Sequence, residues 1–251
     1  MKLPFGLGLP LDISTHGWQI DRIFNILHVF MILLFVGWFL FLIYVLVKFR
    51  SRPGHKATYA PKHTKFSTYL EVGIALFEAF MLIFLALPAW KNAKASMPSG
   101  KEVFPIRIVA EQFAWNIHYA GEDGVFGKTD AQRMSSENPV GLDSEDPAAK
   151  DDYVAINTLN IPVHRPIVVQ LSSKDVIHSF YLPVLRVKQD VIPGMVFPVW
   201  FEAKETGEFE IACAQLCGLG HYRMRGTLTI QTEEKFNQWL KEERAQSQEA
   251  F

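Results

Sequence analysis

The chain has 251 residues, enough for one large or two small domains. Its hydrophobic content of 49% is ordinary for a globular protein and its net charge is −1, but these averages conceal two unlike parts. Residues 1–96 carry ten Lys/Arg against four Asp/Glu, whereas residues 97–251 carry fifteen against twenty-two. A basic, apolar first part and an acidic, polar remainder indicate a membrane anchor followed by an aqueous domain, and we expect no nucleic-acid partner.

The N-terminal residues 1–25 mix Pro and Gly with acidic residues. They lack the basic-then-apolar order of a signal peptide, so we interpret them as a loop or interfacial segment. Ile26–Val47 follows with 22 residues and no charge. As a helix it would be about 33 Å long, enough for a bilayer core of roughly 30 Å, and it is the first predicted membrane span.

A basic loop separates this span from a second apolar segment. Lys48–Lys65 contains six Lys/Arg and no acid, which by the positive-inside rule places it on the cytoplasmic side and both termini outside. Val72–Trp90 has 19 residues and one charge, Glu78, and is the second predicted span. Trp90 and the lysines after it are typical of an interfacial anchor.

The pattern changes after residue 103. Short strand-like segments with turn signals between them predict a β-sandwich or small barrel, and the clearest are 104–110, 113–119, 165–172, 196–203, 207–212 and 226–231. Thr232 can cap a final helix with an apolar face of Phe236, Trp239 and Leu240. Residues 121–152 are a polar, acid-rich insertion without a calcium-loop pattern, and we favour a solvated loop over a cation site.

The chemistry is concentrated in Cys213-Ala-Gln-Leu-Cys217-Gly-Leu-Gly-His221-Tyr-Arg-Met224, which holds the only two cysteines of the chain. Thiolate, thioether and imidazole together favour copper over hard cations. A mononuclear blue-copper site needs one Cys, two His and an axial Met. The second Cys means that two sulfurs could be shared between two metals. The best candidate for the second His is His178 in Asp-Val-Ile-His-Ser-Phe.

A disulfide and a structural zinc site fit the cysteine pair less well than copper does. A disulfide is possible in an oxidising compartment, but its small loop would contribute little entropic stabilisation. It would also leave His178, His221 and Met224 without a role. A structural zinc site would use only Cys and His, so Met224 fits it poorly.

These motifs, with the two apolar segments, resemble subunit II of a haem–copper cytochrome c oxidase, which carries the dinuclear copper A centre. The resemblance implies a two-helix transmembrane hairpin followed by an all-β cupredoxin-like Greek-key barrel with a C-terminal helix. The hairpin would occupy residues 1–96, with spans at about 26–47 and 72–90. The external copper domain would occupy residues 97–251, with the insertion at about 121–152.

The resemblance also implies the ligand set. Cys213 and Cys217 would bridge two copper ions, and His178 and His221 would each bind one of them. The weak ligands would be Met224 and the backbone carbonyl of Gln215. Many family members have Glu at the position of Gln215, where its carboxylate helps to hold magnesium at the subunit I interface. The resemblance therefore does not support magnesium binding through this side chain.

Further roles are carried over from matching positions. Gln112-Phe113-Ala114-Trp115 resembles the segment through which electrons from cytochrome c enter, with Phe113 in place of the usual first Trp. Glu71 lies where family members have an acid at the mouth of a proton path, and Glu78 is an intramembrane acid, so both are candidates for proton uptake. Lys188–Gly194 resembles a loop that packs on subunit I.

The expected function is therefore that of the oxidase subunit which accepts electrons from cytochrome c and passes them to haem in subunit I, where oxygen reduction is coupled to proton translocation. Partners would be subunits I and III, cytochrome c and membrane lipid, and the copper domain would lie on the periplasmic side of a bacterial inner membrane. We expect no haem in this chain, which has no Cys-x-x-Cys-His motif.

Three alternatives belong to other classes. A quinol oxidase subunit II shares the architecture but lacks the copper ligands. A membrane-tethered copper carrier would need neither two spans nor the loop at Lys188–Gly194. Nitrous oxide reductase also has a copper A domain, but it requires a large catalytic domain for which this chain has no room.

Overall fold

The computed structural model describes residues 10–54, 56, 65–100, 102–121 and 123–249. The described residues form two compact units. One is a helical unit made from residues 19–92. The other is a β unit, which combines residues 93–249 with residues 10–18 from the N-terminal side of the first helix.

The helical unit consists of two long, apolar helical segments. Helix α1 covers Gly17–Lys48, and α2 covers Lys65–Met81. The second segment continues through a π-helical turn at Leu82–Ala86, the short α3 at Leu87–Trp90 and another π-helical turn at Lys91–Ala95. Pro88 in α3 has no N–H for the carbonyl four residues earlier, which accounts for the irregular turn before it. The rings of Phe30 and Phe77 pack 4.2 Å apart between α1 and α2.

Both segments are long and apolar enough to cross a membrane. Their most apolar windows are 0% and 6% buried inside the chain, which separates them from the core helices of a soluble protein. The two predicted apolar helices are therefore confirmed. Half of the predicted basic loop, residues 55 and 57–64, lies outside the described residues, as do residues 1–9 of the N-terminal segment.

The interpretation of residues 17–25 as a loop is wrong, because α1 already begins at Gly17. Ser14 Oγ accepts a hydrogen bond of 2.7 Å from the Gly17 N–H, and Asp12 Oδ1 accepts one of 2.9 Å from Ser14 Oγ. These polar side chains satisfy a free N–H at the helix start, which moves the start of α1 to a position well before the apolar run.

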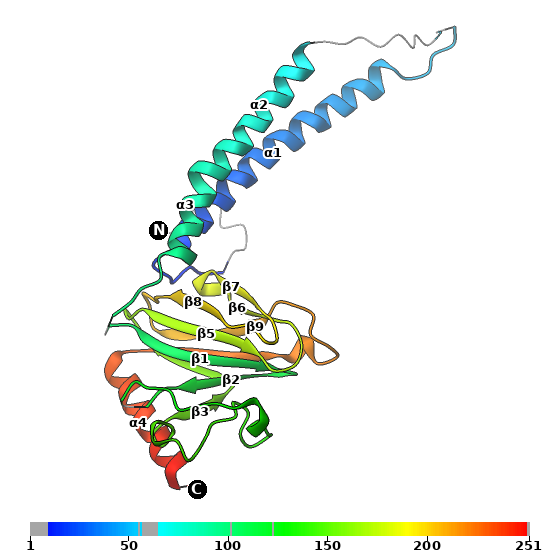
Figure 1. Cartoon of the computed structure of the whole chain (residues 1–251). Helices are drawn as coiled ribbons and strands as arrows, with labels where there is room; N and C mark the ends of the chain where they lie inside the picture. The colour runs from blue at the N-terminus through cyan, green and yellow to red at the C-terminus, as the bar shows by residue number, and fades with distance from the viewer. Residues whose placement is uncertain (1–9, 55, 57–64, 101, 122, 250–251) are drawn as a thin grey trace. The chain divides into compact units, whose positions relative to one another are not determined.

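The β unit contains two five-stranded sheets packed as layers, which Figure 1 shows. The first sheet has the order β3-β2-β1-β5-β8 and the second β4-β10-β9-β6-β7. The strands of the first sheet are β1 Phe104–Glu111, β2 Ala114–Tyr119, β3 Tyr153–Ile156, β5 Ile167–Ser173 and β8 Phe197–Phe201. Those of the second sheet are β4 Thr158–Pro162, β6 His178–Leu182, β7 Val187–Val191, β9 Gly207–Cys213 and β10 Arg225–Gln231.

Alternation of side chains along the strands builds the core between the sheets. On β1, Ile106, Ile108 and Ala110 are fully buried while the residues between them are partly exposed. The final helix, α4 Glu233–Glu249, adds Phe236 and Leu240 to this core. The predicted fold class, two apolar helices followed by a β domain with a C-terminal helix, is confirmed.

The segment before α1 belongs to the core of the β unit. Ile13 is fully buried there. Its N–H donates to the carbonyl of Val184 at 2.9 Å, and its carbonyl accepts from the N–H of Lys204 at 2.7 Å. Ser14 forms a β-bridge with Ala203. A single short segment thus adds backbone pairing and one large apolar side chain to the β unit.

The insertion is organised by a buried carboxylate. Asp152 accepts hydrogen bonds from the backbone N–H groups of Gly121 at 2.9 Å and Gly127 at 2.8 Å, and it lies 2.6 Å from His118 Nε2. Asp130 and Asp146 each cap a 3₁₀ turn. The described carboxylates named here bond to backbone groups or to His118, so the insertion is more ordered than the solvated loop that we predicted.

Candidate metal centre

The centre lies where the loop between β9 and β10 meets the start of β6. Cys213 ends β9, and the loop that follows carries the rest of the cysteine motif. Antiparallel pairing of β6 with β9 sets Phe180 opposite Cys213, and the Ala214 N–H donates to the Ser179 carbonyl at 3.0 Å. This register brings His178, the first residue of β6, beside the loop from a distant part of the chain.

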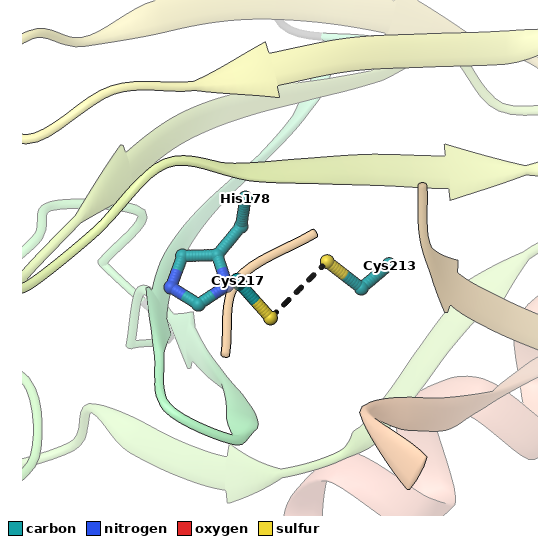
Figure 2. Close-up of side chains that lie close together, drawn as sticks. All are labelled: His178, Cys213 and Cys217. Atoms are coloured by element: carbon teal, nitrogen blue, oxygen red, sulfur yellow. Dashed lines mark hydrogen bonds between the residues drawn. The ribbon is translucent and has the colours of Figure 1, made fainter. Parts of the chain in front are cut away.

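The predicted ligand atoms converge. Figure 2 shows His178, Cys213 and Cys217 together, and one ligand atom from each lies within 4.8 Å of the others. The two sulfurs are 3.8 Å apart. Cys217 Sγ lies 3.6 Å from both His221 Nδ1 and Met224 Sδ.

The remaining predicted ligand is a main-chain oxygen. The carbonyl of Gln215 lies 3.2 Å from Cys213 Sγ. Because this oxygen belongs to the main chain, its contact with Cys213 Sγ does not depend on whether residue 215 is Glu or Gln. All six predicted donor groups therefore lie in one cluster.

Three of the donor residues are buried, whereas Cys213 and His221 are half-buried and Gln215 is exposed. His178 is 0% exposed, Met224 2% and Cys217 4%. His178 Nε2 is held by Asp175 Oδ1 at 2.9 Å, whereas its other ring nitrogen, Nδ1, is buried and has no hydrogen-bond partner. A buried nitrogen without a partner is costly, and a metal ion would satisfy it.

The two thiols are free, and their separation of 3.8 Å is well beyond the ~2.05 Å of a disulfide. Burial raises the pKa of Cys213, but contacts with His178, Ser179 and Gln215 outweigh burial and bring that pKa below its usual range. Burial and the nearby Cys213 together raise the pKa of Cys217. Two thiolates this close repel each other, and a cation between them would remove that repulsion.

This donor set fits copper. Thiolate, thioether and imidazole are soft or intermediate ligands, and a site with two thiolates, two imidazole rings and a Met thioether is not the all-Cys/His set of structural zinc. Two closely spaced sulfurs can each contact two metals, whereas a mononuclear blue-copper site uses one.

Comparison with known proteins agrees with this geometry. A family model described as "Cytochrome C oxidase subunit II, periplasmic domain" matches residues 106–231. The chain is 35% identical over 233 residues to the alternative cytochrome c oxidase subunit 2 of Bradyrhizobium diazoefficiens, covering 92% of this chain and 83% of the relative. The chain belongs to the cytochrome c oxidase subunit II family.

Other members of the subunit II family match over shorter stretches. Cytochrome c oxidase subunit 2 of Cereibacter sphaeroides is 31% identical over 148 residues, which cover 55% of this chain and 49% of the relative. The crystal structure of the periplasmic domain of subunit II of cytochrome oxidase from Bradyrhizobium japonicum is 27% identical, with a TM-score of 0.44, and the match covers 60% of this chain and 98% of that one. As a subunit II, the chain is part of an oxidoreductase complex, as predicted.

The two aromatic residues of the Gln112–Trp115 segment differ in their surroundings. Phe113 is partly buried on the turn between β1 and β2, and its ring packs so closely on the metal loop that a Cβ added at Gly220 would lie 2.4 Å from it. Trp115 is fully buried, with ring centroids 6.2 Å from His178 and 5.4 Å from Phe180. The structure thus places both rings next to the metal loop or its ligand.

The two candidate proton-uptake acids lie on α2, outside the metal cluster. Glu71 Oε1 accepts a hydrogen bond of 3.3 Å from Ser67, and Glu78 lies seven residues further along. Both acids are exposed within the chain. Seven residues are close to two helical turns, so they share one helix face.

One interpretation needs correction. Most of the predicted subunit I loop Lys188–Gly194 is strand, because residues 188–191 belong to β7 and pair with β6. The turn proper contains Gly194, whose φ of 76° favours glycine. Lys188 and Asp190 are exposed and charged, as residues of a loop often are. In the sequence they hide the alternation of buried and exposed residues that is typical of a strand.

Two residues that support the centre were not predicted. Asp175 holds the ligand His178, and Gln112 reaches the metal loop with a side-chain hydrogen bond to the carbonyl of Cys217 at 2.7 Å. Each is part of a motif that carried the resemblance, Asp-Val-Ile-His and Gln-Phe-Ala-Trp. In these motifs the metal ligand and the aromatic residues are recognisable from their residue type. The Asp or Gln at the start of each motif is a common polar residue, and its type alone does not indicate a role.

Proposed function

We propose that this chain is the electron-accepting subunit of a cytochrome c oxidase. It takes electrons from a cytochrome c at a dinuclear copper A centre and passes them to haem in subunit I, where oxygen reduction is coupled to proton translocation. The observation that supports this most strongly is the convergence of two free thiols, 3.8 Å apart, with the partnerless Nδ1 of buried His178.

The donor groups divide into three kinds. Cys213 and Cys217 would hold both copper ions as bridging thiolates. His178 and His221 would each hold one ion through a ring nitrogen. Met224 and the carbonyl of Gln215 would act as weak ligands. Two copper ions bound there would supply one-electron redox chemistry.

The chain itself holds the ligands in defined positions. Asp175 fixes the His178 ring by accepting its Nε2–H, which leaves Nδ1 as the free nitrogen. Strand pairing through β6 and β9 holds the two parts of the donor set in register. Because His178 and Cys213 lie on these paired strands, their positions change little when the charge of the centre changes, which reduces the rearrangement that electron transfer requires.

We further propose that α1 and the second helical segment form the membrane hairpin, with the β unit on the periplasmic side of a bacterial inner membrane. The basic composition of residues 48–65 supports this orientation. Subunits I and III and membrane lipid would surround the hairpin. Glu71 and Glu78 are the candidates for proton uptake. Glu78 lies within the second span, where an acid is costly and usually functional, and Glu71 lies just before that span, where the family has an acid at the mouth of a proton path.

The test is copper content and spectroscopy of the full-length chain purified from membranes with its associated subunits. We expect two copper ions per chain bound by the cysteine motif and, in the oxidised protein, one unpaired electron shared by both ions. Cys217→Ser should abolish that sharing, because it removes one bridging sulfur. One copper per chain with an ordinary blue-copper spectrum would contradict the proposal, and absence of a haem-bearing subunit from the purified protein would favour a copper carrier.

A further inference from the structure

Gln112 connects the two separate parts of the donor set. Its backbone N–H donates to Asp175 Oδ2 at 2.7 Å, and the other oxygen of Asp175 lies 2.9 Å from His178 Nε2. Its side-chain Nε2 donates to the carbonyl of Cys217 at 2.7 Å. One residue on the turn between β1 and β2 therefore touches both the support of His178 and the main chain of Cys217.

The contact with Cys217 reaches a part of the loop that strand pairing does not hold. The ends of the loop are fixed by Cys213 N–H to the Met224 carbonyl at 3.2 Å and by Ala214 N–H to the Ser179 carbonyl at 3.0 Å. In the described part of the chain, the bond from Gln112 is the hydrogen bond that joins residues 215–220 to another loop. Cys217 lies in the middle of this stretch, between both anchored ends.

The shape of the loop fits this side chain. Gly218 has a φ of 131°, and a Cβ there would lie 2.7 Å from Gln112 Nε2 and 3.3 Å from Phe113. Absence of a side chain at Gly218 thus allows the amide to reach the Cys217 carbonyl. A carbonyl only accepts, so the amide must present its N–H₂, and neither a carboxylate nor an aliphatic group could replace it.

We propose that Gln112 is a positioning residue for the copper centre, which fixes the Cys217 sulfur relative to His178 and so sets the geometry of the bridging pair. The proposal rests on the proposed function. Partners of metal ligands orient them, and their loss commonly weakens metal binding about 10- to 100-fold. Here the partner acts on the main chain of the ligand, and it joins the loop of Cys217 to the carboxylate that holds His178.

The test uses two variants of the full-length chain, purified with its associated subunits. Gln112→Leu removes the donor without adding charge, and Gln112→Glu keeps the shape but replaces the donor with an acceptor. Gln132→Glu is the matched control, since Gln132 is an exposed glutamine of the insertion. The measurements are the copper hyperfine splitting, the reduction potential and the rate of copper loss to excess bicinchoninic acid.

We expect both Gln112 variants to lose copper about tenfold faster than the wild type and to show altered hyperfine splitting, while Gln132→Glu matches the wild type. A wild-type splitting and loss rate in Gln112→Leu would overturn the proposal, even if Gln112→Glu differs, because charge alone would then be the cause. A variant that merely unfolds at lower temperature without copper, but has the wild-type spectrum when loaded, would also overturn it.

The outcome also separates this proposal from the function on which it rests. A wild-type protein that does not hold two copper ions would contradict both. A wild-type protein with the shared-electron spectrum, together with unchanged Gln112 variants, would contradict the positioning role alone.

Discussion

The carboxylate of Asp175 offers the sharpest test of how the centre is held. It accepts three hydrogen bonds, from the backbone N–H of Val176 at 2.6 Å, that of Gln112 at 2.7 Å, and His178 Nε2 at 2.9 Å. Asp175→Asn keeps the shape but replaces one oxygen with an N–H₂ group. Whichever way the amide turns, its N–H₂ group faces at least one of the three N–H groups, and that hydrogen bond is lost. The negative charge that supports the His178 ring is lost as well.

The structure sets the size of the effect. A hydrogen bond to a charged group contributes about 1.5–3 kcal/mol, and loss of an outer partner of a metal ligand commonly costs about 10- to 100-fold in affinity. The Asp175 side chain is 30% exposed, so water replaces part of what is lost. We therefore expect the lower end, about a tenfold loss of copper affinity, or about 1.4 kcal/mol.

The assay is a competition titration of copper between the full-length protein and a chelator, followed by absorbance. Asp130→Asn is the control, because Asp130 also accepts a backbone N–H, that of Gln132 at 2.9 Å, but lies in the insertion. It makes the same change of charge away from the site. An Asp175→Asn affinity within about twofold of the wild type, with an unchanged spectrum, would refute the idea that this carboxylate holds the His178 ligand.

Two further predictions concern electron acceptance and stability. Phe113→Ala should slow reduction of the centre by its cytochrome c donor severalfold in stopped-flow experiments, because an apolar contact at the metal loop is lost; a wild-type rate at every salt concentration would show that electrons enter elsewhere. Ile13→Ala should destabilise the β unit by about 2–5 kcal/mol, since Ile13 is fully buried, whereas an exposed neighbour such as Leu11→Ala should not. The loss of stability would be measured as a lower midpoint temperature for loss of the copper absorption. Equal midpoint temperatures for Ile13→Ala and the wild type would contradict the assignment of Ile13 to the core.

The sequence was most informative where function is encoded in consecutive residues. Most of the predicted donor groups lie in one stretch from Cys213 to Met224, so their spacing alone predicts that they can meet. The apolar spans are equally local, because 22 residues without a charge have few alternatives to a membrane helix. The first and last strands were found from alternation, for example on β1, where buried and partly exposed residues follow each other.

Elements that depend on distant partners were missed. Strands β6 and β7 carry His178, Lys188 and Asp190, and these polar residues hide the strand pattern. The two strands are stabilised by pairing with each other and, for β6, by pairing with β9. Nothing near Gln112 in the sequence shows that its amide reaches Cys217, which lies more than a hundred residues later. Residues 10–16 look like a loop because Ile13 stands among Pro and polar residues, and its backbone partners lie far along the chain.

The position of Ile13 also has a consequence for how the protein is made. Ile13 is synthesised before the first helix, yet its backbone partners, Val184 and Lys204, leave the ribosome only after both membrane helices and most of the strands. Contacts between residues this far apart form late and slowly. The β unit therefore cannot reach its final state as the chain emerges, and residues around Ile13 must wait unpaired while the hairpin is inserted. The bridge between Ser14 and Ala203 likewise closes only after Ala203 is synthesised, so the N-terminal segment completes the β unit as one of its last steps.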